Sequence, residues 1–334
     1  GAVHAEHDAG TLFTEIADIS VQLKGEGLAE TYLDQQQILD VAIDQGCDSV
    51  HPGFGFLSER ADFAQAVMDA GLIWIGPSPE AITKMGDKMT ARITMKEAGV
   101  PVIPGEEING GIEEVIEVAP SVGYPLLLKA TAGGGGKGMR AVHHPDNLES
   151  EAKAAMREAL NAFGDDRIYI ERLLTGSRHI EIQVLADNFG RTIHLGEREC
   201  SVQRRHQKVF EESPSVALDS ELREAMGSAA CNAARAVDYV GAGTVEFLVT
   251  PTGEFFFLEM NTRIQVEHPV TEMVTGVDLV REQLRIAGGE PMSCRELFMR
   301  GHAIEVRLYA EDPANNFLPS IGPLKRFIAP TGPG

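Results

Sequence analysis

Short apolar runs alternate with amphipathic stretches over residues 1–73, which predicts strands interleaved with helices. Residues 47–50 and 72–75 are typical of short buried strands, whereas residues 38–43 and 61–70 carry the apolar spacing of helices. Strands that alternate with helices form parallel, doubly wound sheets. The loop HPGFGFLSE follows the first of these strands, where such sheets bind ligands, and its Ser58 is predicted to cap the next helix.

The rest of the chain divides into further predicted units. Residues 74–100 have helical spacing and form a linker. In the small mixed unit that follows, strands are predicted at 124–130, 139–142 and 167–171 and a helix at 147–162. In the strand-rich remainder, strands are predicted at 179–186, 192–199, 243–250 and 254–261 and helices near 219–238 and 277–287. The predicted units are therefore residues 1–73, 74–100, 101–171 and 172–334.

Composition narrows the classes of function. A length of 334 residues with 43% hydrophobic residues supports two or three domains with sizeable cores. The formal net charge of −21 argues against nucleic acid or an anionic membrane surface as a partner. No apolar stretch approaches the ~20 residues that a membrane span needs. The 4 cysteines are far apart and form no zinc-binding spacing, which favours a reduced, intracellular protein.

A glycine tract, TAGGGGKG, points to phosphate binding. Its glycines follow a G-x-G-x-x-G order, but predicted strands flank both sides, so it is no dinucleotide fingerprint. Lys137 is followed by Gly138, which excludes a Walker A motif. The remaining interpretation is a glycine hairpin whose backbone amides close over phosphates, with Lys129 supplying positive charge. A purely structural glycine turn is the alternative.

A second motif places two carboxylates opposite each other. The runs GTVEFLVT and FFFLEMN flank a turn predicted at Thr252-Gly253. A hairpin with that turn places Glu246 across from Glu259, with Asn261 on the same face. Like charges opposed across a strand pair need a compensating cation, and oxygen ligands beside phosphates suit Mg²⁺. The alternative is that both glutamates point to solvent.

Basic residues are concentrated in a few places of this acidic chain. The places of interest are QRRHQK, which ends at Lys208, RIQVEH, which begins at Arg263, and Arg307. A cationic pocket in a negative surface suggests small anionic substrates. Glu267 in that setting could act as general base for a weak acid such as bicarbonate. His206 and His268 lack metal-site spacing and are interpreted as hydrogen-bonding residues.

Together these motifs closely resemble biotin carboxylases, which are ATP-grasp enzymes. The resemblance covers the whole chain and rests on HPGFGFLSE, MGDK, KATAGGGGKG, RHIEIQ, ERECSVQRRHQK and EMNTRIQVEHPVTE. It implies an ATP-grasp fold of α/β and α+β class, with a partial doubly wound (pre-ATP-grasp) N-terminal lobe, a mobile glycine-rich lid and a truncated C-terminal lobe. It also implies an ATP-dependent ligase that uses ATP, Mg²⁺ or Mn²⁺, and bicarbonate to carboxylate biotin, which serves as carrier substrate.

The resemblance also implies roles for individual positions. The implied nucleotide-binding residues are Lys88, Lys129, Gly133, Gly134, Gly135, Gly136, Gly138, Glu171, Leu173, His179, His206 and Leu248. The implied metal ligands are Glu246, Glu259 and Asn261, and the implied bicarbonate site is Lys208, Arg263, Gln265 and Val266. Glu267 matches the base that deprotonates bicarbonate, and Arg307 matches the residue that holds the biotin enolate; with Lys208 and Arg263 these form the implied catalytic set.

Partners follow from the same resemblance. It implies a biotin carboxyl carrier domain or protein, a carboxyltransferase subunit, and a homodimer in the complete protein. The runs LEMNTRI and EHPVTE resemble acyl-CoA carboxylase α-subunits more than pyruvate carboxylases. The chain is interpreted as a fragment that lacks the family's first strand, so residues 1–73 are expected to be its least stable part. The implied compartment is the cytoplasm for a bacterial protein, with the mitochondrial matrix open for a eukaryotic one.

Two other functions stay open at this point. One is another ATP-grasp ligase, such as a carbamoyl-phosphate synthase-like domain. The other is a truncated nucleotide-binding remnant without activity. Biotin-stimulated ATP turnover separates the first from a biotin carboxylase, and the presence of every matched active-site residue argues against the second.

Overall fold

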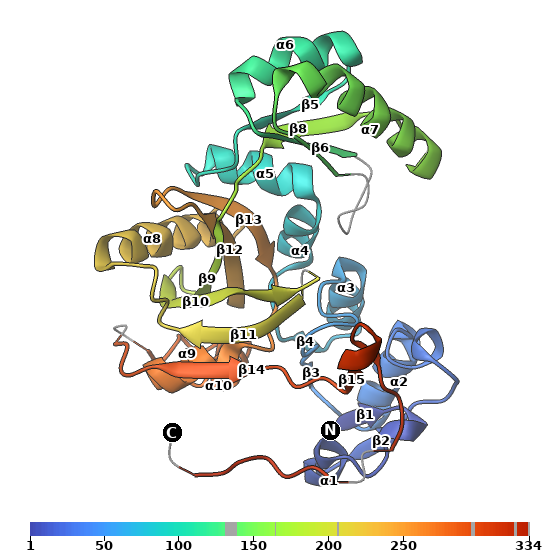
Figure 1. Cartoon of the computed structure of the whole chain (residues 1–334). Helices are drawn as coiled ribbons and strands as arrows, with labels where there is room; N and C mark the ends of the chain where they lie inside the picture. Colours follow the sequence, from blue (N-terminus) through green and yellow to red (C-terminus); the bar gives the residue numbers. More distant parts are fainter. Residues whose placement is uncertain (131–138, 164, 206, 295–297, 324–325, 333–334) are drawn as a thin grey trace.

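The computed structural model describes residues 1–130, 139–163, 165–205, 207–294, 298–323 and 326–332. Three lobes are visible in Figure 1. The N-terminal lobe (blue) and a lobe built on a large sheet (yellow to orange) lie at one end, and a smaller lobe (green) projects from the other end. No helix in the described part of the chain is long and apolar enough to cross a membrane. All 4 cysteines are free.

Parallel strand pairs form the centre of the N-terminal lobe, as the alternating pattern predicts. β1 (Ala2–His4) pairs with β2 (Ser20–Gln22), and β3 (Ser49–Val50) pairs with β4 (Ile73–Trp74), in two separate sheets. The helices of this lobe are α1 (Leu12–Ile16), α2 (Gln35–Asp44) and α3 (Ala61–Asp69). The apolar faces of α2 and α3 contribute to a buried cluster in which the rings of Phe63 and Trp74 meet edge to face at 5.8 Å.

One detail of this lobe differs from the sequence prediction. Ser58 does not cap α3, because the residue before that helix is Arg60 and its side chain makes no capping hydrogen bond. Ser58 is instead 1% exposed, and its hydroxyl has no partner among the described residues. The prediction failed because the loop runs two residues further before its backbone becomes helical.

The linker consists of two helices, α4 (Pro79–Gly86) and α5 (Lys88–Glu97). Asp87 ends one and caps the other, because its extended backbone breaks the helix and its carboxylate accepts the Thr90 N–H at 2.7 Å. The break places Lys88 in the first turn of α5, beside β13 (Phe255–Asn261), a strand of the large sheet.

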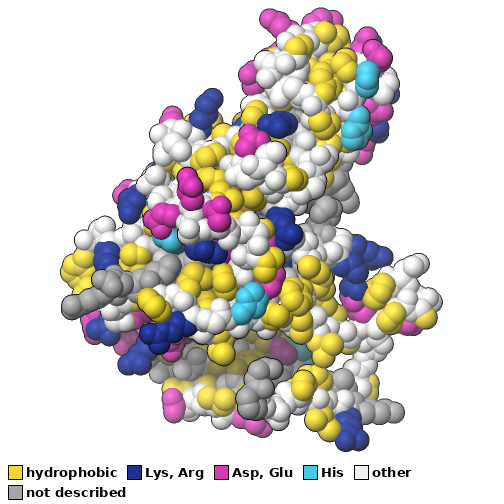
Figure 2. All heavy atoms as spheres, turned by 60° about the vertical axis from the view of Figure 1, so that its left-hand side comes forward, with side chains coloured by type: hydrophobic (Ala, Val, Ile, Leu, Met, Phe, Trp, Pro, Cys, Tyr) yellow, Lys and Arg dark blue, Asp and Glu magenta, His cyan; other side chains and the backbone are white. Residues whose placement is uncertain are grey.

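The projecting lobe is a sheet with two helices. Its 4 strands run in the order β5-β8-β6-β7, and all pairs are antiparallel. The elements in chain order are β5 (Gly105–Ile108), α6 (Ile112–Val122), β6 (Leu126–Ala130), β7 (Arg140–Val142), α7 (Leu148–Phe163) and β8 (Ile168–Arg172). Both helices bury apolar residues against the sheet, and acidic side chains spread over the outside of the lobe (Figure 2).

The large lobe contains a 6-stranded antiparallel sheet in the order β13-β12-β9-β10-β11-β14. Its strands are β9 (Arg178–Ala186), β10 (Thr192–Arg204), β11 (Gln207–Ser213), β12 (Gly241–Val249), β13 (Phe255–Asn261) and β14 (Ala303–Val306). Its helices are α8 (Ser220–Ala236), α9 (His268–Thr275) and α10 (Leu279–Ala287). A short pair, β15 (Glu311–Asp312) and β16 (Leu318–Pro319), follows.

Strand alternation gives this sheet two different faces. Ile180, Ile182 and Val184 of β9 are buried with α8 residues in the main apolar core. The residues between them, Glu181 and Gln183, therefore point to the opposite face, and both are 0% exposed. β12 alternates in the same way, so that buried polar side chains gather on the face away from α8.

We retain residues 1–73, 74–100, 101–171 and 172–334 as proposed units.

Candidate active site

A cleft of about 710 Å³ opens on this polar face. It lies over β9, β12 and β13, and the loop after β13 forms one of its sides. The sequence-predicted residues that line it are His179, Lys208, Glu246, Leu248, Glu259, Asn261, Arg263, Gln265, Val266, Glu267 and Arg307. Phe54 and Gly55 of the N-terminal lobe also line it. The fold thus brings together residues from β9 to just beyond β14.

The hairpin of β12 and β13 pairs the two carboxylates as predicted, with Glu246 across from Glu259. The turn itself differs, because Thr250 pairs with Glu254 through a 2.8 Å hydrogen bond and the loop is one residue longer than predicted. A β-bulge at Leu258 compensates for that extra residue and restores the predicted register. Asn261 lies on the same face and donates from Nδ2 to Glu246 Oε1 at 2.8 Å.

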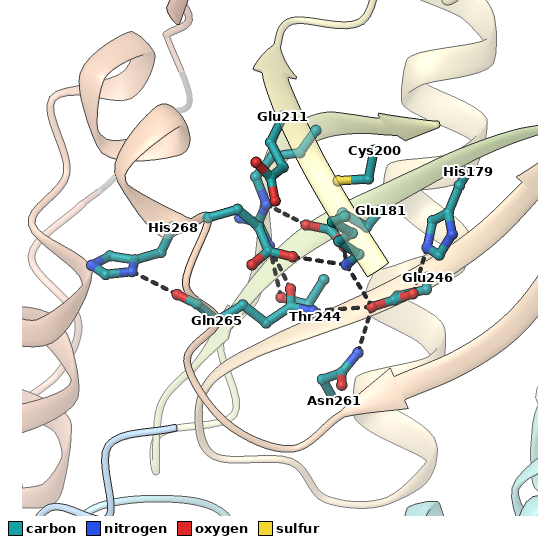
Figure 3. A network of polar contacts seen from close by, with 12 residues as sticks. His179, Glu181, Cys200, Glu211, Thr244, Glu246, Asn261, Gln265 and His268 are labelled. Atoms are coloured by element: carbon teal, nitrogen blue, oxygen red, sulfur yellow. Dashed lines mark hydrogen bonds and ion pairs between the residues drawn. The ribbon is translucent and has the colours of Figure 1, made fainter. Parts of the chain in front are cut away.

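Lys208 is the centre of the site's charge network, shown in Figure 3. Its ammonium donates to Glu181 Oε2 at 2.5 Å, Glu246 Oε1 at 2.9 Å and Glu267 Oε1 at 2.7 Å. These bonds use all three of its hydrogens. The three carboxylates are at most 4% exposed, and the lysine side chain is 13% exposed. One cation therefore holds three buried anions together.

The network shifts the pKa values of its members. Burial alone would raise the pKa of Glu246, but hydrogen bonds from His179 and the charge of Lys208 lower it to about 2. Burial would likewise raise the pKa of Glu181, yet Arg198 and Lys208 keep it below its usual value. Burial would lower the pKa of Lys208, but the charges of Glu181 and Glu246 raise it. All three groups are therefore charged near neutral pH.

Glu259 behaves differently from its partner across the hairpin. Burial first, and then the negative charge of Glu246, raise the pKa of Glu259, while Lys88 and Lys208 lower it. Its side chain reaches the edge of the cleft and also lines a smaller hollow of about 220 Å³ with Lys88. Two opposed carboxylates, with the Asn261 amide beside them, form an oxygen-rich donor set that fits a divalent cation, whose charge would relieve their repulsion.

Sequence reasoning missed Arg198, which lies fully buried beneath the cleft. Its guanidinium donates to Glu181 at 2.5 Å and Gln183 at 2.6 Å, and to Gln265 Oε1 at 2.7 Å. It also donates to the hydroxyls of Thr244 and Thr271, both at 3.0 Å. Gln265 in turn donates to Glu246 at 3.0 Å, so its amide orientation is fixed from both ends. The sequence signal that could have revealed this buried network is the placement of charged residues between the apolar residues of a strand, as in RHIEIQ and ERECS.

Two further arginines contact groups at the cleft. Arg263 donates to Glu59 of the N-terminal lobe at 3.0 Å and to Asn261 Oδ1 at 2.9 Å. Arg307 donates to Glu267 Oε2 at 2.9 Å and to Glu211 at 2.7 Å. Glu59 and Glu211 were not among the sequence-predicted residues. The His268 ring forms a hydrogen bond with the Gln265 carbonyl at 2.7 Å, in line with its interpretation as a hydrogen-bonding residue.

Other predicted residues lie outside this cleft. Lys129 and Glu171 lie diagonally across from each other on neighbouring strands of the projecting lobe and form an ion pair. Leu173 follows β8, and its N–H donates to the Pro125 carbonyl at 2.7 Å. Gly133, Gly134, Gly135, Gly136, Gly138 and His206 lie outside the described residues. Within QRRHQK, Lys208 lines the cleft, whereas Arg204 pairs with Glu311 and stacks on Phe317 at 4.4 Å.

The fold and the site define an ATP-grasp protein, in which a small mixed lobe projects beyond a large antiparallel sheet whose polar face carries a cleft lined with charged residues. Residues 87–295 match the family described as "Carbamoyl-phosphate synthase L chain, ATP binding domain". Residues 2–82 match "Biotin carboxylase, N-terminal domain". The chain belongs to the biotin carboxylase family.

Individual relatives agree with this assignment. The chain is 52% identical to a biotin carboxylase of Nostoc sp. and 50% identical to biotin carboxylase 1 of Bacillus subtilis, in each case over 100% of this chain and 75% of the relative. Among solved structures, a biotin carboxylase complex from Campylobacter jejuni has a TM-score of 0.89 at 44% identity, covering 99% of this chain and 74% of that one. The ATP-grasp fold expected from the sequence is confirmed.

The buried position of Arg198 leads to a stability prediction. Arg198→Met should lower the free energy of unfolding by about 3–5 kcal/mol, because it leaves Glu181 as a buried charge without one of its two cationic partners, the other being Lys208. Arg60→Met is the control: it removes an ion pair to Asp62 in which both side chains are more than half exposed, and should cost at most about 1 kcal/mol. Urea unfolding of both variants provides the comparison. Equal losses would mean that Arg198 contributes no more than a surface arginine.

Proposed function

We propose that this chain catalyses the MgATP-dependent carboxylation of biotin by bicarbonate, with the biotin carried on a carrier domain or protein. The observation that carries the proposal is Glu267, a buried carboxylate whose two oxygens contact Lys208 and Arg307 at the cleft. A base between two cations suits an anionic substrate that must lose a proton. Solved 2-oxoglutarate carboxylase domains with 42–44% identity to this chain are complexes with MgADP and bicarbonate, or with bicarbonate.

Bicarbonate activation uses the residues at one end of the cleft. We assign anion binding to Lys208, Arg263, Gln265 and Val266, all of which line the cleft. Glu267 removes the bicarbonate proton, and the resulting carbonate oxygen attacks the γ-phosphorus of ATP, forming a P–O bond as the bond to ADP breaks. Carboxyphosphate is the product of this step. Its C–O bond then breaks to give CO₂ and phosphate, so the attacking oxygen stays on phosphorus.

The biotin half of the reaction needs a base and a stabiliser for negative charge. Phosphate released beside the biotin ring accepts its N–H proton, and the enolate that results attacks CO₂ to form carboxybiotin. We assign stabilisation of the enolate oxygen to the Arg307 guanidinium, which the structure places next to Glu267. A guanidinium fits this role because it is always charged and presents several donors.

The nucleotide site extends from the cleft towards the projecting lobe. We assign Glu246 and Glu259, with Asn261 beside them, to the metal ion, which neutralises phosphate charge when bound. Binding of the cation would replace Lys208 as the partner of Glu246 and leave the ammonium available to the anionic substrate. We assign nucleotide contacts to Lys88, Lys129, Glu171, Leu173, His179, His206, Leu248 and the glycines of residues 133–138.

The acyl-CoA carboxylase class is the subtype that we propose. LEMNTRI and EHPVTE support it, and a rat methylcrotonoyl-CoA carboxylase α-subunit is 47% identical over 98% of this chain. Solved pyruvate carboxylase structures are also similar, at 40–44% identity. A carboxyltransferase subunit and a homodimer belong to the same proposal. The match of residues 2–82 to the biotin carboxylase N-terminal domain supports this function over the carbamoyl-phosphate synthase alternative.

The metal assignment predicts the effect of one substitution. Glu259→Gln should lower ATP turnover by at least ~10²-fold, the scale of removing one well-placed electrostatic contact, and should raise the Mg²⁺ concentration needed for half-maximal rate. Glu254→Gln, at the exposed turn of the same hairpin, is the control and should leave both quantities unchanged. The measurement is steady-state ATP cleavage with saturating bicarbonate and biotin. Unchanged turnover in Glu259→Gln would remove this residue from the metal site.

The assignment of Glu267 as the base predicts that its substitution affects ATP cleavage and leaves ATP binding nearly unchanged. Glu267→Gln keeps the shape of the side chain but cannot accept the proton, so bicarbonate-dependent ATP cleavage should be lost while ATP affinity stays within a few-fold. Nucleotide binding by calorimetry and ATP cleavage with and without bicarbonate give the two readouts. A large loss of ATP affinity would instead make Glu267 a structural residue.

A further inference from the structure

A second pair of opposed carboxylates lies at the edge of the large sheet, next to the cleft. β11 and β14 are antiparallel, and their register places Glu211 directly across from Glu305. Residues directly opposed in this way have side chains on the same face of the sheet. Arg307 is two residues beyond Glu305 along the chain, and its backbone N–H continues the pairing to Val209 at 3.0 Å. All three polar side chains therefore share one face.

Glu211 is completely buried, and only one of its oxygens is satisfied. Oε1 accepts a hydrogen bond from Arg307 Nε at 2.7 Å. Oε2 is buried without a hydrogen-bond partner among the described residues. An unpaired buried oxygen is unfavourable, so a donor is expected beside it. Figure 3 shows Glu211 at the border of the charge network.

The charges that face Glu305 come from several elements. Glu211 on β11 and Glu267 before α9 are negative, while Arg307 beyond β14 and Arg198 on β10 are positive. Arg307 is already engaged by Glu211 and Glu267. Burial, and then the charges of Glu211 and Glu267, raise the pKa of Glu305 to about 7. Burial also raises the pKa of Glu211.

We propose that Glu305 is a positioning residue: as a neutral carboxylic acid it donates a hydrogen bond to Glu211 Oε2, and the pair holds Arg307 against Glu267. The proposal rests on the function proposed above, because it gives Arg307 a substrate to orient. The register places the Glu305 side chain across from Glu211 on the same face, so its carboxyl, when protonated, is the donor that we assign to the unsatisfied oxygen. With one shared proton, the pair carries a single negative charge, which matches the single positive charge of the guanidinium.

The protonation state of Glu305 makes the position of Arg307 depend on pH. Because the pKa of Glu305 is raised, the proton is held on the acidic side of about pH 7 and lost as the pH rises through that value. The ionised pair would then carry two negative charges and draw Arg307 away from Glu267. Contacts of Arg307 with biotin should weaken over that range, whereas the nucleotide end of the cleft should not respond.

Two substitutions separate the proposed hydrogen bond from a merely structural role. Glu305→Gln keeps a donor at every pH and carries no charge, so it should retain low-pH affinity for biotin across the whole range. Glu305→Leu has no donor and no charge, so its KM for free biotin should not change with pH and should lie about tenfold above the low-pH value of the wild type, the scale of one charge-assisted hydrogen bond, with KM for ATP unchanged. Glu212→Gln is the matched control, because Glu212 is adjacent on β11 and pairs with His302 on the other face.

The experiment combines these kinetics with infrared spectroscopy of the substrate-free enzyme. We expect the wild type and Glu212→Gln to show a protonated-carboxyl band that disappears through about pH 7, and Glu305→Gln to lack it. The KM for biotin should rise over the same range in wild type and stay flat in Glu305→Gln. The same band in Glu305→Gln, or an unchanged pH dependence of its KM, would overturn the proposal. Absence of any biotin-dependent ATP cleavage would instead refute the proposed function, and the infrared titration would still decide the state of Glu305.

Discussion

The site depends on the neutralisation of several carboxylates buried in one cleft. Glu181, Glu246 and Glu267 share the ammonium of Lys208, and Arg198 holds Glu181 from beneath. Removing a charge from water is unfavourable unless it is paired and hydrogen-bonded, so each acid here requires a cation in place. The strand alternation that buries Ile180 and Ile182 against α8 is what turns Glu181 to the opposite face of the sheet, where it is buried beside Lys208. The same alternation of side chains along β9 therefore determines both the packing of the core and the position of the buried charge.

This balance of charges also suggests how the ion pairs rearrange when the metal ion and the anionic substrate bind. A metal ion at Glu246 and Glu259 would replace Lys208 as counter-charge, and the freed ammonium could hold an anion beside Glu267. Catalytic groups that are already oriented need little reorganisation when the reaction proceeds. Gln265 illustrates this, since Arg198 and Glu246 hold the two ends of its amide. The opposed pair Glu211 and Glu305 extends the same principle to Arg307.

Much of the fold and part of the site could be predicted from the sequence, because local periodicity reports strands and helices directly. The facing of Glu246 and Glu259 was correct although the turn was one residue longer, since the bulge at Leu258 offset that difference. Arg198 and Glu211 were missed because their roles come from strand pairing across distant segments. Ser58 was misassigned because a capping residue type does not fix where the backbone becomes helical. Arg204 stood beside the site in sequence, yet its side chain pairs with Glu311 instead of lining the cleft.

Oxygen transfer tests the central claim, that this cleft activates bicarbonate by attack on ATP. The enzyme would be incubated with ATP, Mg²⁺, biotin and ¹⁸O-labelled bicarbonate, and the released phosphate analysed by mass spectrometry at early times. Because the attacking oxygen stays on phosphorus when carboxyphosphate breaks down, the account predicts one bicarbonate-derived ¹⁸O in each phosphate formed. Phosphate whose one newly added oxygen comes from water and not from bicarbonate would show simple ATP hydrolysis and contradict the account.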